Sequence, residues 1–405
     1  MLDVVFYSPH FGQNTLRFVE PIKNLQDVNL IGLGQDSQEY IDGLGCFNEF
    51  YRVENATDEE QLTEALTKIS RGRKIDKLLN TLEEYQIMVG RLREKFGIEG
   101  LDSETAKKFR DKALMKQVFK ENGILCADYQ RTENNEDARE FIARNGFPII
   151  AKPLKGAGCV NTFLIFNDEQ FESALKALNP SPENPSILEE FIQGEEGSFD
   201  TFTVNGEIEF YSITTYNPPL LDAMMNEWIQ PIYALNKNLR GSHNNEIKEI
   251  GAKVIKALGL KTAMTHMEWF RRESDGKIYI GEIAARPPGH PVIDVHNYAH
   301  DIDIFAEWGK LMIYDKNFII AEPKHNVGAA CLRAQGEGQT ITGISGVEEA
   351  KDRLKDYIEG LHLPEIGSPR MDSYVGEGLL FCRGEDFEKT LWASTYGTEI
   401  IKLHC

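Results

Sequence analysis

The chain has 405 residues, of which 41% are hydrophobic and 27% charged, an ordinary balance for a protein that buries a full core. This length favours two or three domains over one. A formal net charge of −20 argues against a nucleic-acid partner, which would require a basic face, and no apolar run is long enough to span a bilayer.

The cysteines and the first residues bear on the compartment. Six cysteines are scattered along the chain without a C-x-x-C pair, which favours reduced thiols in the cytoplasm over a disulfide framework or a zinc site. The opening residues, MLDVVFYSPHFG, lack a basic leader followed by a long apolar block, so they predict a first strand and not a signal peptide. The sequence leaves the oligomeric state open, with a homodimer as one alternative.

The first hundred residues alternate between short apolar runs and amphipathic segments. The expected strands are Asp3–Ser8, Asn29–Leu33 and Phe50–Val53, and the expected helices are Asn14–Leu25, Glu59–Ile69 and a long one over Lys77–Phe96. This alternation predicts a parallel, Rossmann-like α/β domain over residues 1–102. Gly32 and Gly34 do not form a G-x-G-x-x-G turn, so dinucleotide binding has little support.

The middle of the chain carries one predicted helix and several hairpins. Ser103–Asn122 is expected to be a helix with Ser103 as its N-cap. The apolar run FPIIAKP predicts a buried strand that holds Lys152, and the next strand makes Lys155–Gly158 a hairpin tip. Glycine-rich tips can bring backbone N–H groups close to phosphates, although glycine at such a place is more often only a turn. Asn205-Gly206 predicts another hairpin turn.

A further helix, Glu246–Leu258, leads into the stretch MTHMEWFRRESDGKIYIGEIAARPPG, which begins at Met264. It predicts two strands joined at Ser274-Asp275-Gly276, with Gly276 in the left-handed conformation. Met264, His266, Glu268 and Phe270 would share one face of the first strand. Ile278, Ile280, Glu282, Ala284 and Arg286 would share one face of the second. If Glu273 pairs with Lys277, Glu268 lies directly opposite Glu282.

Two opposed carboxylates require an explanation. Opposed Cβ atoms are about 5 Å apart, and two charges at that distance repel by about 3 kcal/mol at an effective dielectric of about 20. A shared proton could relieve the repulsion, as could a divalent cation, since Mg²⁺ is bound by carboxylates together with substrate phosphates. The alternative is that both acids point to solvent.

The last part of the chain has a different character. His300–Ile313 predicts a helix, and residues 325–405 combine short strands, several glycines and a helix at Val347–Tyr357, which predicts a small C-terminal α+β domain. His296 and His300 are one helical turn apart, a spacing that can bind a metal when a third ligand is near. No third ligand is evident from the sequence.

Five fragments in order, RDKALMK, FPIIAKPLKGAG, LEEFIQGEEGS, HMEWF and GEIAARPPG, resemble the ATP-grasp superfamily over roughly Ser103 to His300. Within it, the E-x-A-A-R…G run at Glu282–Gly289 is similar to that of the carboxylate–amine ligases, including the L-amino-acid ligases. The resemblance implies an N-terminal pre-ATP-grasp domain (residues 1–102), the ATP-grasp domain (residues 103–324) and a small C-terminal domain (residues 325–405).

The resemblance also implies roles for individual residues. Lys112, Lys152 and Lys155 would contact the phosphates of ATP; Glu189, Glu190, Ile192 and Glu196 would hold the adenosine; Glu268 and Glu282 would bind Mg²⁺, with Mn²⁺ as the alternative ion. Lys112 could instead be a solvated surface lysine, and the acids an exposed strand end. Ala284 departs from the asparagine of many relatives, which weakens the case for a second cation.

Arg286, on the predicted face of Glu282, could hold the substrate carboxylate and then the transferred phosphoryl group, or form an ion pair with Glu268 or Glu282. His266 and His290 flank it and could line the pocket of the acceptor. The implied reaction is ATP-dependent amide formation through an acyl phosphate, with small-molecule carboxylate and amine substrates and with Lys155–Gly158 as a closing flap. A carboxylase-like enzyme using carboxyphosphate and a non-catalytic ATP-binding regulator are the alternatives.

Overall fold

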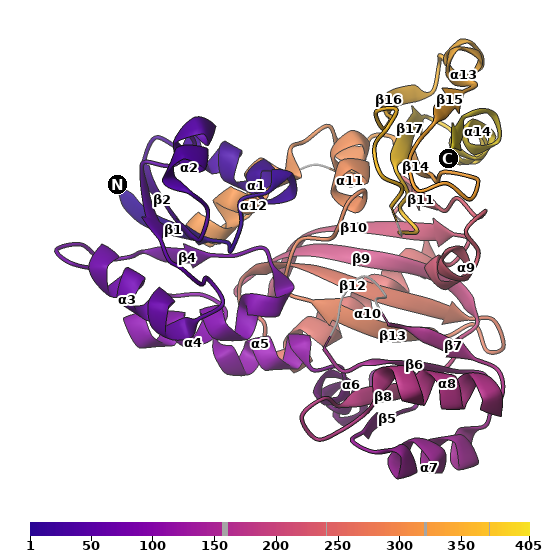
Figure 1. Cartoon of the computed structure of the whole chain (residues 1–405), viewed down its shortest axis with the longest axis horizontal. Helices are drawn as coiled ribbons and strands as arrows, with labels where there is room; N and C mark the ends of the chain where they lie inside the picture. The colour runs from indigo at the N-terminus through magenta and orange to yellow at the C-terminus, as the bar shows by residue number, and fades with distance from the viewer. Residues whose placement is uncertain (156–160, 240, 320–321, 372) are drawn as a thin grey trace.

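The first unit of the fold is a four-stranded parallel sheet in the order β3-β2-β1-β4 (Figure 1). The computed structural model describes residues 1–155, 161–239, 241–319, 322–371 and 373–405. The unit's strands are β1 (Leu2–Tyr7), β2 (Val28–Gly34), β3 (Glu49–Arg52) and β4 (Lys77–Leu79), and its helices are α1 (Gln13–Lys23), α2 (Gln38–Leu44), α3 (Glu59–Ile69), the 3₁₀ turn η1 (Glu83–Tyr85) and α4 (Gln86–Phe96). The predicted parallel α/β unit is confirmed.

The predicted helix over Lys77–Phe96 is wrong in its first half. Lys77, Leu78 and Leu79 pair in parallel with Val4, Val5 and Phe6 as the edge strand β4. The loop that follows is closed by the Asn80 side chain, which accepts from the Leu82 N–H and donates to the Leu82 carbonyl. Tertiary pairing with β1 therefore overrides the local helical pattern, and the helix begins only at α4.

A small antiparallel sheet, in the order β5-β8-β6-β7, forms a second unit. It consists of β5 (Tyr129–Thr132), β6 (Ile149–Pro153), β7 (Phe163–Ile165) and β8 (Ser186–Glu190), with helices α7 (Asn135–Asn145) and α8 (Asp168–Leu178). The predicted hairpin of β6 and β7 is confirmed, but residues 156–158 of its tip lie outside the described residues.

The predicted helix Ser103–Asn122 is two helices, α5 (Ser103–Arg110) and α6 (Lys112–Glu121). Asp111 ends α5 and begins α6, because its extended backbone breaks the helix and its carboxylate accepts the N–H groups of Ala113 and Leu114. The N-cap of α5 is Asp102, and not Ser103 as predicted. Aspartate is a strong N-cap, so the interruption follows from its side chain.

The largest sheet has eight strands in the order β13-β12-β9-β10-β11-β14-β17-β16. These are β9 (Gly194–Val204), β10 (Glu207–Asn217), β11 (Ile232–Leu235), β12 (Ala263–Arg272), β13 (Ile278–Ala284), β14 (Asn326–Leu332), β16 (Ile358–His362) and β17 (Gly378–Gly384). Asn205 and Gly206, both with positive φ, form the predicted turn between β9 and β10. The sheet runs without interruption into the strands of residues 325–405.

Helices connect and cover these strands. They are α9 (Leu220–Met225), α10 (Ser242–Leu258), α11 (Val292–His300), α12 (Ile304–Tyr314), α13 (Val347–Arg353) and α14 (Phe387–Ile400), and a two-stranded sheet joins β15 (Gly343–Ser345) to β18 (Lys402–His404). The predicted helix His300–Ile313 is wrong at its start: Asp301 ends α11 in the left-handed conformation, and Asp303 caps α12.

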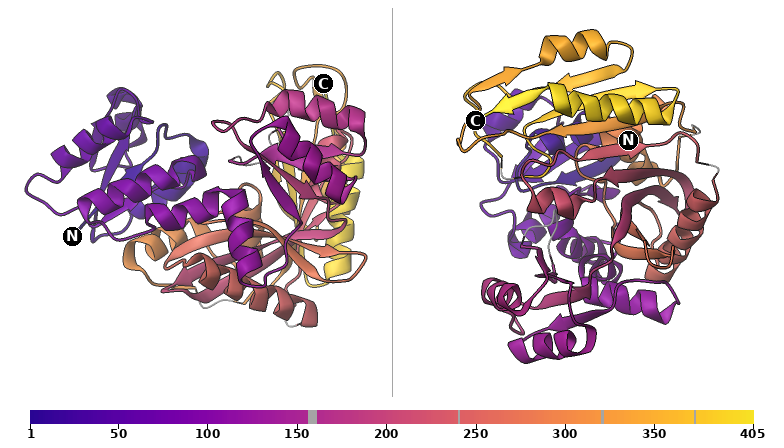
Figure 2. Two further views of the ribbon diagram at one scale, coloured as in Figure 1. Left: turned by 90° about the horizontal axis from the view of Figure 1, so that it is seen from below. Right: turned by 90° about the vertical axis from the view of Figure 1, so that its right-hand side faces the viewer.

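Helix α12 returns to the first unit. Its Trp308 and Phe305 pack with Phe18 of α1 and Phe6 of β1 in one apolar cluster. Figures 1 and 2 show the first unit and the C-terminal helix α14 on opposite sides of the molecule, with the large sheet between them. The small sheet lies at a third side of the molecule, below the large sheet in Figure 1.

Strands β12 and β13 form the predicted hairpin, with a register that differs from the prediction near the turn. Trp269, Phe270 and Arg271 pair with Ile280, Tyr279 and Ile278, one residue away from the predicted partners. A bulge at Gly281 adds one residue to β13 and so returns the pairing to the predicted register. Glu268 therefore lies opposite Glu282 as predicted. A Cβ at position 281 would lie 2.8 Å from the Phe270 ring, which explains the glycine at the bulge.

Because of the bulge, the side chains of β13 before Gly281 lie on the opposite face of the sheet from the one predicted. Ile278 and Ile280 pack with Trp269 in an apolar core, whereas Tyr279 packs with Phe270 and Ile192. The predicted common face of Ile278, Ile280 and Glu282 is therefore wrong, because the inserted residue breaks the simple alternation of a strand. Gly276 has the predicted positive φ of 68°.

Candidate active site

A cavity of about 1080 Å³ lies where the small sheet faces the large one, with residues 81–84 of the first unit at its wall. The predicted site residues that line it are Lys112, Lys152, Glu189, Glu190, Ile192, Glu196, Glu268, Glu282 and Arg286. Lys155 is exposed and, among the described residues, is not part of the lining. The cavity thus brings together nine of the ten predicted residues from four regions of the chain.

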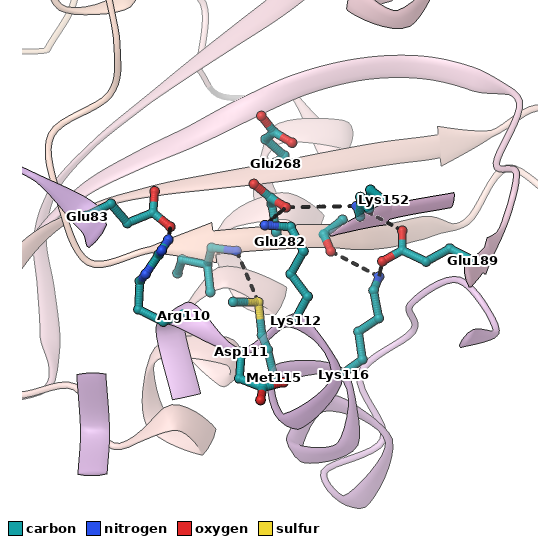
Figure 3. Close-up of polar contacts among 12 residues, drawn as sticks. Glu83, Arg110, Asp111, Lys112, Met115, Lys116, Lys152, Glu189, Glu268 and Glu282 are labelled. Carbon is teal, nitrogen blue, oxygen red and sulfur yellow. Dashed lines mark hydrogen bonds and ion pairs between the residues drawn. The ribbon is translucent and has the colours of Figure 1, made fainter. Parts of the chain in front are cut away.

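Glu268 and Glu282 form the floor of this cavity on the β12–β13 ladder (Figure 3). Each side chain is 28% exposed, so the alternative that both point freely into solvent is wrong. Burial, together with the charge of Glu282, raises the pKa of Glu268. The repulsion expected from the sequence is therefore present, and it raises the pKa of Glu268 and not that of Glu282.

Two lysines neutralise the other member. Lys112 Nζ lies 3.0 Å from Glu282 Oε2, and Lys152 Nζ lies 3.9 Å from the same oxygen (Figure 3). Although burial opposes ionisation, Lys112 and then Lys152 hold the pKa of Glu282 at about 2. The Lys112 side chain is only 8% exposed, so it is not the solvated surface lysine that was considered as an alternative.

Glu189 joins a third lysine to this group. Its carboxylate lies 3.0 Å from Lys152 Nζ and 3.5 Å from Lys116 Nζ. Burial raises the pKa of Glu189, but the charges of Lys116 and Lys152 outweigh it and leave the pKa lowered. Three lysines therefore gather around Glu189 and Glu282, and such a cluster of cations in a cavity wall can bind a polyanion.

The strand end after β8 supplies polar groups at one end of the cavity. Glu190 binds Arg272 through its carboxylate and donates its N–H to the Asp128 carbonyl. Within the described parts of the chain, the N–H of Ile192 donates to no protein acceptor. Glu196 is buried and accepts the Leu220 N–H at 2.7 Å; burial, reinforced by Glu268, raises its pKa to about 8.

Arg286 is held from another unit of the fold. Its Nε donates to Glu83 Oε2 at 2.8 Å, and its Nη1 donates to the Pro287 carbonyl at 2.9 Å. Glu83 also binds Arg110. The ion pair of Arg286 with Glu268 or Glu282, considered from the sequence, is therefore replaced by a pair with Glu83, 203 residues away in the chain.

The histidines lie around a buried aspartate. His266 lines the cavity, and its Nδ1 is 2.6 Å from Asp200 Oδ1. His296 Nε2 is 3.3 Å from the other oxygen of Asp200. His296 and His300 are buried, and the described residues contain no group of three or more His, Cys, Asp or Glu able to hold a metal. The spacing of His296 and His300 therefore reflects a packed core.

Lys116, Glu83 and Asp200 were missed by the sequence analysis. Lys116 follows Lys112 by four residues and so lies on the same helix face, a signal that was available in RDKALMK. Glu83 lay inside a wrongly predicted helix, and its contact with Arg286 spans two units, so no local pattern indicates it. Asp200 lies in β9, where every residue from Glu196 to Val204 is buried, so no alternation of exposure distinguishes it.

Comparison with known proteins places this geometry in a family. The model of the ATP-grasp domain matches residues 145–293. The chain is 30% identical over 305 residues to the L-arginine-specific L-amino acid ligase of Bacillus subtilis, an alignment that covers 74% of this chain and 72% of the relative. It is 26% identical over 232 residues to the alanine–anticapsin ligase of Bacillus subtilis, covering 52% of this chain and 48% of that relative.

Solved structures agree on the fold. An L-amino acid ligase from Bacillus licheniformis superposes with a TM-score of 0.77 at 16% identity, covering 100% of this chain and 98% of the other. N5-carboxyaminoimidazole ribonucleotide synthetase from Thermotoga maritima superposes with a TM-score of 0.70 at 18% identity, covering 100% and 99%. Fold and cavity together define an ATP-grasp enzyme.

Within that superfamily the chain belongs to the carboxylate–amine ligases of the L-amino-acid ligase type. It is an ATP-dependent ligase that forms carbon–nitrogen bonds. No helix among the described residues has the length and apolar character needed to cross a membrane.

Proposed function

We propose that this enzyme joins two amino acids, or a closely related acid and amine, through an acyl phosphate. The observation that carries the proposal is the pair Glu268 and Glu282 facing each other in a cavity that also holds Lys112 and Lys152. Named relatives are amino acid ligases, which supports amino acids as the substrate class. The large cavity would take ATP and the acid.

The chemistry requires little covalent work from the protein. A carboxylate oxygen attacks the γ-phosphorus of ATP, the bond from that phosphorus to the bridging oxygen breaks, and ADP leaves. The amine nitrogen then attacks the acyl carbon, and the carbon–oxygen bond to phosphate breaks. One ammonium, one carboxylate and one ATP thus give an amide, ADP, hydrogen phosphate and one proton. Positioning and charge neutralisation dominate such a transfer.

The proposed roles follow the positions of the residues. Lys112 and Lys152 would turn from Glu282 to the phosphates, with Lys155 approaching them from the hairpin. Glu189, the backbone of Glu190 and Ile192, and Glu196 would hold the adenosine. The N–H of Ile192, which donates to no acceptor among the described residues, suits an acceptor on the adenine edge. Arg286 would stabilise the acid and the transferred phosphoryl group.

Mg²⁺ fits the acidic floor. Glu268 and Glu282 offer hard oxygen donors in the cavity wall, and a Mg²⁺ site commonly uses one or two carboxylates completed by phosphates and water. When bound, the ion would neutralise phosphate charge. Mn²⁺ would be a substitute with similar ligands. Burial and the charge of Glu282 raise the pKa of Glu268, and a bound cation would offset that repulsion.

The setting of the reaction is also a proposal. The charge of −20 supports small-molecule substrates over nucleic acid, and the described cysteines are free thiols, which supports the cytoplasm. The proposed assembly is a homodimer. Light scattering would measure the mass of the protein in solution and test it.

Isotope transfer tests the mechanism. Pairs of the common L-amino acids, one labelled with ¹⁸O in its carboxylate, would be incubated with ATP and Mg²⁺. The expected result is a dipeptide and one ¹⁸O atom in the released phosphate. Formation of AMP and pyrophosphate, or phosphate without label, would contradict an acyl phosphate. Phosphate release only with hydrogencarbonate would favour the carboxylase-like alternative, and ATP binding without turnover would favour the regulator.

A matched pair of variants assigns the acidic floor. Glu282→Gln should abolish ligation while the protein stays folded, because the amide removes the charge that a cation requires. Glu207→Gln, at an exposed position at the start of β10, should leave ligation unchanged. Retained ligation in the Glu282 variant would remove this residue from the mechanism.

A further inference from the structure

Helix α9 forms part of the wall of the large cavity. Its N-cap Pro219 and its residues Leu221 and Asp222 line the cavity. The helix has only six residues, of which Leu220 and Ala223 are buried, and a helix this short is not stable by itself in water. Contacts with other elements must therefore set its position.

Two hydrogen bonds connect α9 to distant parts of the described chain. At its start, the Leu220 N–H donates to Glu196 Oε2 at 2.7 Å. In its last turn, the Ala223 carbonyl accepts from Arg333 Nη1 at 2.6 Å. Arg333 directly follows β14. The helix therefore joins Glu196, which the proposed function assigns to the adenosine, to an arginine from residues 325–405.

Arg333 also holds the turn that follows α9. The same Nη1 atom donates to the Asn226 carbonyl at 3.0 Å and to the Ile229 carbonyl at 2.9 Å. Three carbonyl oxygens thus converge on one guanidinium nitrogen. The last carbonyls of a helix have no partner within it, and a positive charge at this end is favourable. Arg333 therefore stabilises both the end of α9 and the turn after it.

Burial makes this contact mutual. Arg333 is 9% exposed, and no carboxylate among the described residues forms an ion pair with it. Burial lowers the pKa of Arg333 against the opposing charges of Glu227 and Glu377. A buried cation is costly without hydrogen-bond acceptors, and the three carbonyls supply them. Displacement of the loop would leave the guanidinium unpaired, so arginine and loop fix each other.

Glu196 is the contact of α9 inside the cavity. It is 6% exposed and lines the cavity. Its Oε2 accepts the Leu220 N–H, and within the described residues its Oε1 accepts no hydrogen bond. This oxygen can exchange a hydrogen bond with a hydroxyl group, and the hydroxyl groups of adenosine are those of the ribose. Because Leu220 fixes the rotation of the carboxyl group, the position of α9 sets the direction of Oε1.

We propose that Arg333 is a positioning residue for ATP, which acts through α9 to hold the carboxyl group of Glu196 against the ribose. Arg333 itself is not part of the cavity lining. The inference rests on the proposed function and gives residues 325–405 a role in nucleotide binding, although Tyr374 is the only described residue of that part that lines the cavity.

Hydrogen exchange tests the contact between Arg333 and the loop without any substrate. Mass spectrometry would compare the wild type with Arg333→Met in the absence of nucleotide. Amides of residues 219–231 should exchange about tenfold faster or more in the variant, while protected amides in β1 and β2 would show that it is folded. Arg383→Met, which releases Asp301 and Glu359, should leave residues 219–231 unchanged. Equal exchange in the wild type and Arg333→Met would overturn the proposal.

The preference for ribose tests the connection to Glu196. Ligation would be measured with ATP and with 2′,3′-dideoxy-ATP and expressed as the ratio of the two kcat/KM values, in which the amount of active enzyme cancels. The ratio should be about ten or more for the wild type, roughly the effect of one hydrogen bond to a charged group. It should fall towards one in Glu196→Ala and in Arg333→Met. Arg333→Lys, a cation with three donors on a shorter side chain, should give an intermediate ratio, and Arg383→Met the wild-type ratio.

The double variant Arg333→Met/Glu196→Ala should have the ratio of Glu196→Ala alone, because both changes act on one contact. A wild-type ratio in Arg333→Met, or in Arg333→Lys if the methionine variant does not fold, would overturn the inference and leave the proposed function intact. A ratio near one in the wild type would do the same. No amide product from any pair of substrates with ATP would overturn the proposed function and this inference with it.

Discussion

Glu282 is the residue at which the charges of the site meet. Lys112 and Lys152 approach the same oxygen of its carboxylate, and they keep Glu282 ionised while Glu268 takes the raised pKa. The sequence indicated that two opposed carboxylates need neutralising and offered a proton or a cation. The structure adds a third solution, two lysines that are themselves suited to bind phosphate.

The protonation of Glu196 should make the stability of the protein depend on pH. Its pKa of about 8 lies above the ordinary value of 4.5, so between these pH values the folded state keeps a proton that the unfolded chain has lost. The free energy of unfolding should therefore fall as pH rises through this window. Glu196→Gln carries no such proton and still has an oxygen for the Leu220 N–H, so its stability should fall less.

Urea denaturation between pH 5 and pH 8.5, without nucleotide or metal, measures this difference. The exposed Glu207→Gln should follow the wild-type dependence on pH. Parallel curves for wild type and Glu196→Gln would show that Glu196 is not protonated in the folded state.

Helix α6 and strand β13 are connected by three side chains of the helix. Lys112, Met115 and Lys116 share one face of α6 and contact three consecutive residues of β13. Lys112 binds the Glu282 side chain, Met115 Sδ accepts the Ile283 N–H at 3.4 Å, and Lys116 Nζ donates to the Gly281 carbonyl at 3.0 Å (Figure 3). Because β13 is the edge of the sheet, these side chains satisfy backbone groups that have no neighbouring strand.

Lys116→Met tests this connection. The variant removes the cation that joins the bulge at Gly281 to Glu189, so Glu282 and Lys152 should lose their fixed positions. A hydrogen bond to a charged group contributes about 1.5–3 kcal/mol, and we expect the KM for ATP and the Mg²⁺ concentration for half-maximal rate to rise roughly tenfold. Lys120→Met, one turn further along α6 and exposed, is the control. Equal values for both variants would exclude a positioning role for Lys116.

Asp111 gives a second prediction for α6. Its carboxylate caps the helix directly before Lys112, so Asp111→Ala should lower the free energy of unfolding by about 0.5–2 kcal/mol and raise the KM for ATP. Asn134→Ala removes the cap of α7, a helix of which no residue lines the cavity. It should produce a similar loss of stability without a change in KM. A raised KM in both variants would mean that general destabilisation, and not the position of Lys112, causes the effect.

The same elements show what a sequence can predict. Apolar runs such as Val4–Phe6 and the Asn205-Gly206 turn act locally, and their elements were predicted. Lys77–Leu79 was missed because its strand exists only through pairing with β1. The bulge at Gly281 was missed because the glycine is explained by the Phe270 ring across the ladder. The motif residues were found through resemblance, whereas Lys116 and Glu83 required the fold.

Glu83 connects the first unit to the active site. It is buried and binds both Arg110 and Arg286. Removing one charge from a buried network costs about 3–5 kcal/mol, so Glu83→Gln should lower the denaturation midpoint and also reduce kcat through Arg286.

Glu59→Gln, which breaks the exposed pair with Arg91, should do neither, since exposed pairs contribute little. Activity would be measured at a temperature at which both variants are folded, as judged by circular dichroism. A Glu83 variant with normal kcat would show that Arg286 keeps its place without this partner.

The unbroken eight-stranded sheet has a consequence for anyone who shortens or recombines this protein. The ladder from Ile232↔Ala330 to Leu235↔Val327 is the seam between the catalytic strands and the last eighty residues. A fragment ending before β14 would leave β11 as an unpaired edge strand. This edge could pair with the same edge of another copy and cause aggregation. A chimera with a different C-terminal segment would have to keep the register of the pairing between β11 and β14. A shift of one residue would place every side chain of β14 on the opposite face of the sheet.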